Sequence, residues 1–112
     1  IAAANSVVTG EITQAVRDTD SDAGSITAGD WIGIVRGDGI VAIGGTWRAA
    51  AVQLLENLIT PEREIVTILE GVDATAAMTE ELRAWLGENF GNVEVEVHRG
   101  GQPLYPYLFG VE

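Results

Sequence analysis

Three glycine-rich stretches follow predicted strands, and they are the first places where this chain could bind something. Their sequences are Ile43-Gly44-Gly45-Thr46, Glu70-Gly71 and His98-Arg99-Gly100-Gly101-Gln102. In parallel sheets, ligands bind at the carboxyl ends of the strands, and glycine lets a ligand or partner approach the backbone closely. Tight connections select glycine as well, because it tolerates positive φ. On spacing alone we favour the turn explanation.

The first of these stretches opens a predicted helix, so its amides could hold an anion. It lacks the G-x-G-x-x-G spacing and the lysine of a phosphate-binding loop, which argues against a phosphate site.

Asp18, Asp20 and Asp22 imitate the start of a calcium-binding loop. The sixth position of that loop would be Ala23 and the twelfth Gly29, where calcium loops need glycine and glutamate. A polar loop in which aspartates accept nearby backbone N–H groups explains them better.

His98 is the lone histidine, and the chain has no cysteine. A general base needs an oriented partner and a nucleophile, and no Ser/His/Asp set is legible. One histidine without cysteine makes a poor metal site. We therefore expect no catalytic residue, metal site or cofactor within this chain.

Composition excludes several classes of partner. The net charge is −11, and all six basic residues are arginine. Nucleic-acid binding needs a basic stripe, and an anionic membrane surface is disfavoured for the same reason. The acidity could recruit a basic partner, but arginine in place of lysine throughout the chain favours a compositional origin.

Length and hydropathy indicate one domain over residues 1–112. No apolar run approaches a membrane span, and the first residues lack the basic start and apolar stretch of a signal peptide. The absence of cysteine fits a reducing cytoplasm. Because the chain begins without methionine, we expect it to be an excised domain of a longer protein.

Hydrophobic periodicity predicts the elements. Residues 6–19 alternate as a strand with Val8, Ile12 and Val16 on one face, and a loop over 20–30 precedes a β-hairpin that turns at 36–39. Helices are predicted from Thr46 to about residue 59 and over about 75–90. Buried or alternating strands are predicted over 64–70, 93–98 and 104–111.

These elements predict an α/β fold: a mixed sheet with a parallel β-α-β-α-β core, an N-terminal hairpin and two main helices. Residues 39–44, 64–70 and 93–98 should lie parallel. Pro106 cannot donate to a ladder, so we expect the C-terminal strand to be an antiparallel edge strand. Tyr105 and Tyr107 share one face of that strand, which suits an interface, although covering the rim of the core explains them equally well.

Four segments together resemble a known family. They are GEITQAVRDT (10–19), GDWIGIV (29–35), EIVTILEG (64–71) and VEVEVHRGGQPLYPYLFGVE (93–112). In this order they are similar to the C-terminal domain of the dihydroxyacetone-kinase-like fatty acid kinases, the kinase components of the bacterial fatty acid kinase system.

The resemblance implies a non-catalytic role in lipid metabolism, in the cytoplasm. In such proteins an amino-terminal domain binds ATP and magnesium, a middle domain forms a homodimer, and the C-terminal domain docks a DegV-like fatty-acid-binding protein. Two alternatives stay open: a catalytic segment related to dihydroxyacetone kinase or phosphatase, and a self-association module built on an exposed edge strand.

Carried onto this sequence, the family motifs highlight residues in the first strand, the hairpin and the C-terminal stretch. Arg17 and Asp18 could pair locally, and turns would explain Gly100, Gly101 and Pro103. The motifs also include Asp30. The candidate partner-binding residues are Arg99, Gly100, Gly101, Gln102, Tyr105 and Tyr107.

Overall fold

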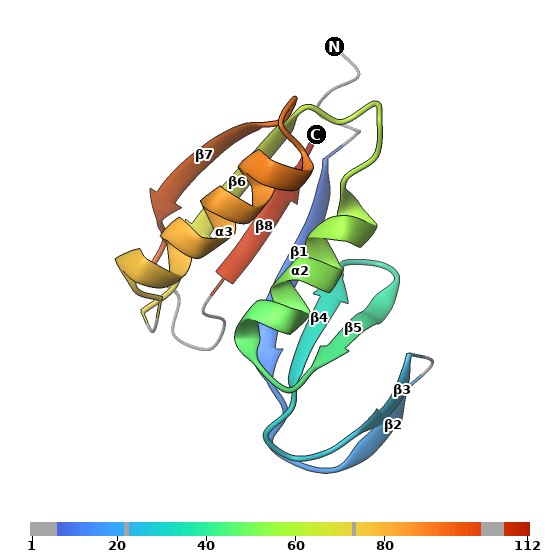
Figure 1. Ribbon diagram of the computed structural model, residues 1–112. Helices are drawn as coiled ribbons and strands as arrows, with labels where there is room; N and C mark the ends of the chain where they lie inside the picture. The colour runs from blue at the N-terminus through green and yellow to red at the C-terminus, as the bar shows by residue number, and fades with distance from the viewer. Residues whose placement is uncertain (1–6, 22, 73, 102–106) are drawn as a thin grey trace.

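The computed structural model describes residues 7–21, 23–72, 74–101 and 107–112. Within these residues the chain forms one large sheet, a short separate hairpin and two helices (Figure 1). The helices are α2 (Trp47–Leu58) and α3 (Ala76–Asn89). The strands are β1 (Val8–Gln14), β2 (Thr19–Ser21), β3 (Gly24–Ile26), β4 (Trp31–Val35), β5 (Gly39–Gly44), β6 (Ile65–Glu70), β7 (Glu94–Arg99) and β8 (Tyr107–Val111).

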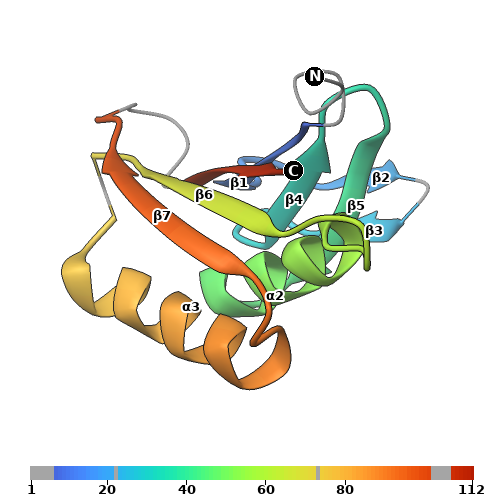
Figure 2. The ribbon, with the colours of Figure 1, turned by 90° about the horizontal axis from the view of Figure 1, so that it is seen from above.

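The six strands of the large sheet lie in the order β5-β4-β1-β8-β6-β7. Neighbours pair antiparallel except β6 and β7, which are parallel. Both helices pack on the same side of the sheet, so the domain has two layers (Figure 2). The predicted α/β class, the hairpin of β4 and β5, and the two helices are confirmed.

The predicted position of the C-terminal strand is wrong. β8 lies between β1 and β6 and pairs with both, so it is a central strand. The strand begins at Tyr107, after the proline that suggested an edge. Its alternate residues Tyr107, Phe109 and Val111 are all fully buried beneath the helices, which an edge position would not achieve.

The predicted parallel core is only partly present. β5 runs in the same direction as β6 and β7, but β4, β1 and β8 lie between β5 and β6. The connection through α2 therefore crosses three strands, whereas β6, α3 and β7 form a parallel unit of neighbouring strands. Sequence periodicity gives the direction of each crossover but not the number of strands it passes.

The first strand is shorter than predicted. β1 ends at Gln14, and Val16 is 91% exposed instead of facing the core. The backbone of Ala15 pairs with the residues just before β4, since its N–H donates to Asp30 O at 2.7 Å and its carbonyl accepts from Gly29 N at 2.9 Å. These bonds turn the chain away from the sheet before Val16.

The stretch expected to be a loop contains the hairpin of β2 and β3. Its aspartates act as local acceptors: Asp18 Oδ1 accepts from Ala28 N at 2.8 Å, and Asp20 Oδ1 accepts from Ser25 Oγ at 3.3 Å. Across the described ranges, no group of three His, Cys, Asp or Glu residues is placed to hold a metal ion. The aspartates therefore serve the hairpin itself.

Both helices begin where the sequence predicts. The Thr46 hydroxyl accepts from Ala49 N at 3.1 Å, and the Thr75 hydroxyl accepts from Met78 N at 3.2 Å, so each threonine caps a helix. The face that packs on the sheet is apolar at helical spacing. Its buried members are Ala50, Ala51, Leu54, Leu55 and Leu58 in α2, and Leu82 and Leu86 in α3.

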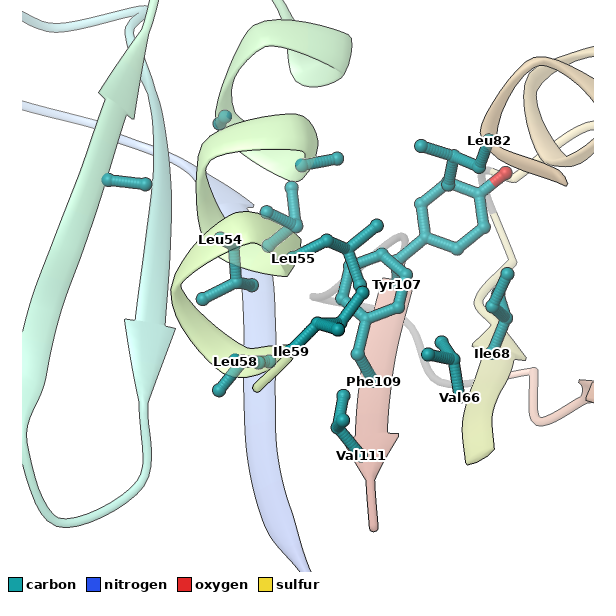
Figure 3. Close-up of a cluster of buried hydrophobic side chains, with 14 of the residues drawn as sticks. Leu54, Leu55, Leu58, Ile59, Val66, Ile68, Leu82, Tyr107, Phe109 and Val111 are labelled. Atoms are coloured by element: carbon teal, nitrogen blue, oxygen red, sulfur yellow. The ribbon is translucent and has the colours of Figure 1, made fainter. Parts of the chain in front are cut away.

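The core lies between these helices and the middle strands. Figure 3 shows the leucines of α2 directed at Phe109 and Tyr107, with Ile68 and Leu82 on the other side of the tyrosine ring. In the part of the chain that is described, neither helix has the length and apolar character needed to cross a membrane.

Candidate functional site

The carboxyl ends of β6 and β7 meet and form a hydrogen-bonded rim. We call Glu70, Gly71, Val72, Ala74 and Arg99–Gly101 the β6–β7 rim. The amides of Gly100 and Gly101 both donate to Glu70 O, at 2.8 and 2.9 Å. Gly101 has φ +70°, a conformation that favours glycine. Two of the three glycine stretches therefore come together as turns, as predicted.

The third glycine stretch lies at the end of β5, across three strands from this rim, so the expected single cluster of glycines does not form. A Cβ on Gly44 would stand 2.8 Å from Ala49 Cβ and 2.9 Å from Ala50 N. The first turn of α2 packs directly against this backbone. Close helix packing therefore explains the glycine without a ligand.

The Arg99 side chain ties the rim to the segment that leads into α3. Its Nη1 donates to Ala74 O at 3.0 Å and its Nη2 to Val72 O at 3.3 Å. Carbonyl groups outside regular structure need such donors. The guanidinium thus has a structural role, while Arg99, Gly100 and Gly101 remain exposed enough to touch a partner.

A chain of three polar side chains lies beneath the rim. The Thr79 hydroxyl, 5% exposed, donates to Glu70 Oε2 and lies 2.8 Å from the Tyr107 hydroxyl. A threonine hydroxyl has one proton. Because that proton goes to Glu70, Tyr107 is the donor in its bond with Thr79. Burial raises the pKa of the Tyr107 hydroxyl, and the Glu70 charge adds to this, whereas the hydrogen bond with Thr79 opposes it.

Tyr107 is therefore not a surface contact, which corrects its place among the candidate partner-binding residues. Its side chain is fully buried. The ring stacks on Phe109 with centroids 5.7 Å apart and is tilted against Trp47 at 6.0 Å. Figure 3 shows the hydroxyl directed toward α3, next to Leu82. The other candidates Gln102 and Tyr105, and also Pro103, lie outside the described residues.

The sequence contains a sign of this polar chain that periodicity alone passes over. Thr79 falls on the apolar stripe of α3, three residues before Leu82. A polar residue on such a stripe needs a buried hydrogen-bond partner. Glu70 and Tyr107 supply partners 9 and 28 positions away.

The remaining highlighted residues serve local structure. Asp30 Oδ2 accepts from Thr27 N at 2.9 Å, and Asp18 caps the amide of Ala28 rather than serving Arg17. His98 lies at the exposed end of β7 with its Nε2 3.5 Å from Glu96 Oε1. None of these contacts brings the histidine to a nucleophile within the described residues.

Comparison with known proteins gives a match over the whole chain. Residues 1–112 match the family of FakA-like C-terminal domains, which belong to fatty acid kinase proteins. Protein YloV of Bacillus subtilis (strain 168) is 41% identical over 112 residues, which is 100% of this chain and 20% of YloV. An uncharacterized protein of Staphylococcus aureus (strain USA300) is 39% identical over 108 residues, 96% of this chain and 20% of that protein.

The chain thus spans about one fifth of the length of these relatives. Its motifs at the first strand and the C-terminal stretch lie inside the matched region. The chain belongs to the family of FakA-like C-terminal domains of fatty acid kinases.

Proposed function

We propose that this domain is a non-catalytic docking module of a fatty-acid-kinase-like protein. Its partner is a DegV-like fatty-acid-binding protein that presents an acyl chain for phosphorylation. ATP and magnesium are bound by a kinase domain elsewhere in the longer protein. Because the proposed reaction consumes ATP, the assembly would work in the cytoplasm. The observation that carries this proposal is the family match over residues 1–112.

The geometry of the β6–β7 rim supports a scaffold role. Glu70 uses its carbonyl to fix Gly100 and Gly101 and its carboxylate to hold Thr79. Arg99 uses two donors on the loop before α3. A catalytic acid or base must be able to reach a substrate proton. These groups instead hold one another, as expected of a rigid surface that meets another protein.

Calorimetry on the full-length protein that carries this domain tests the proposal. The intact protein should bind its DegV-like partner, and a version with residues 1–112 deleted should not. Retained ATP binding by the deleted version would show that the rest of the protein is folded. Equal affinity of the two versions for the partner would refute the proposal.

Two further measurements separate the alternatives. ATP consumption by the purified 112-residue chain, with circular dichroism showing that it is folded, would identify a catalytic segment. Concentration-dependent dimerisation of the same chain in light scattering would favour a self-association module. A folded, inactive monomer agrees with the docking proposal.

A further inference from the structure

The sheet face opposite the helices carries a row of side chains across neighbouring strands. Pairing places Ile40 beside Ile34, Ile34 beside Glu11, and Glu11 beside Leu108. Side chains alternate along a strand, and the neighbours of these residues in β1 and β8 point into the core. Ile34, Ile40, Glu11 and Leu108, with Glu96 at the β7 margin, are called the open face here.

One end of this surface is covered by the small hairpin. A Cβ on Gly24 of β3 would lie 3.8 Å from Ile43 Cδ1, and Ile26 is only 2% exposed. Farther along the row, Ile34, Ile40 and Leu108 are half-buried. Among the described residues, no helix or strand packs over these three side chains (Figure 2). The hairpin thus closes one end and leaves the middle accessible.

Glu11 stands in the middle of the row with apolar neighbours on both sides. Its side chain is 22% exposed, and the nearest cation, Arg36 Nη2, is 4.0 Å away on a side chain that is 76% exposed. A carboxylate that loses water needs a compensating partner. An exposed pair at this distance contributes little. Glu11 is therefore only partly compensated within the domain.

We propose that the open face binds a protein partner that places an arginine or lysine against Glu11 and covers Ile34 and Leu108 with apolar side chains. This inference rests on the proposed docking function and names the surface that docks. An apolar centre with a charged anchor is the arrangement that concentrates binding energy at an interface. Arg36 occupies the anchor in the free domain and gives way to the partner's cation.

Charge complementarity identifies the partner as basic. The chain carries a net charge of −11, and exposed Glu94 and Glu96 lie on this same face at its β7 edge. A second copy would bring these glutamates against one another, and like charges at an interface cost several kcal/mol, roughly. The placement of the acids thus gives the acidity a role that composition alone did not indicate.

The main test is Glu11→Gln in the full-length protein, titrated with the DegV-like fatty-acid-binding protein. Loss of a central charged contact should weaken binding about tenfold or more. Glu56→Gln is the matched control, because it removes the same charge from the exposed side of α2. That variant should bind within about twofold of the wild type.

Arg36→Ala gives a test of opposite sign. Removing Arg36 frees the carboxylate for the partner's cation, so binding should tighten about two- to threefold. If the Glu11–Arg36 pair were merely structural, both variants would weaken binding alike. Glu96→Gln, at an exposed position that does not endanger folding, should weaken binding by a similar small factor.

The outcomes separate this inference from the function on which it rests. No binding by the wild type overturns both. Binding by the wild type, with Glu11→Gln and Glu96→Gln both unchanged, overturns only the open face. A wild type that dimerises, and that Glu11→Gln or Leu108→Ser turns into a monomer, overturns the basic partner in favour of a second copy.

Discussion

The two faces of the central strand pair differ in chemistry although they share one backbone. Toward the helices, β8 presents Phe109 and Tyr107, and β1 presents Ile12, all buried. Away from the helices, the same strands present Leu108 and Glu11, which are half-buried. The difference shows how an alternating strand can supply stability on one side and a contact surface on the other.

The sharpest way to break this comparison is a pair of neighbouring truncations. Phe109→Ala should lower the free energy of unfolding by about 3–5 kcal/mol, because it empties a fully buried site beneath α2. Leu108→Ala, one residue away on the open face, should cost about 1 kcal/mol. Urea denaturation of both variants measures this. Equal losses would mean that the open face is covered as thoroughly as the core.

The buried polar chain gives the next largest effect. Thr79→Val removes the hydroxyl that joins Glu70 to Tyr107 and leaves two polar groups unsatisfied, for a loss of about 1–3 kcal/mol in the free energy of unfolding. Thr79→Ser keeps the hydroxyl and should recover most of that loss. A serine variant as unstable as the valine variant would assign the effect to packing instead.

The Tyr107 hydroxyl adds a pH dependence to the helix-covered face. Its raised pKa means that the folded protein holds this proton after the unfolded chain has released it near the ordinary value of 10.0. The associated stability is present below that value and is lost as the pH rises above it. Tyr107→Phe should lose about 1 kcal/mol at neutral pH.

Urea titrations at about pH 8 and about pH 11 measure this dependence, since the wild type should lose more stability than Tyr107→Phe over that interval. The difference between the two proteins isolates Tyr107 from the other tyrosine. Parallel losses would place the hydroxyl in contact with water.

The smallest effect sharpens the other side of the comparison. Arg36→Ala should change the free energy of unfolding by less than about 1 kcal/mol, because the pair with Glu11 is exposed and long. Thermal unfolding followed by circular dichroism is sufficient to measure it. A larger loss would make this pair part of the scaffold, and would remove the basis for its exchange with a partner.

The sequence predicts the local elements well, because their signals are local. Thr46 and Thr75 mark the helix starts, and apolar spacing marks the buried stripe of each helix. It mispredicts β8, because pairing with β1 and β6 joins segments far apart in the chain. The exposure of Val16 was missed for a related reason: the hydrogen bonds of Ala15 outweigh an alternation that continues past the strand.

The candidate site shows the same division. Gly100 and Gly101 were correctly identified as turn residues, since turn chemistry is short-range. Tyr107 was placed at a surface because its alternation with Tyr105 does not say which face is inward. The open face was not predicted at all, since a row across Ile34, Glu11 and Leu108 exists only after three separate segments pair.

The central position of β8 has a consequence for how the domain is made. Of the strands in the sheet, β8 is the last in chain order, yet it is the one that joins the β5-β4-β1 half to the β6-β7 half. On the ribosome, both halves emerge before the strand that connects them, with the edges of β1 and β6 open to wrong pairing. Completion of the sheet therefore waits for the final strand to be synthesised, which makes nascent chains that stop before residue 107 targets for chaperones and proteases.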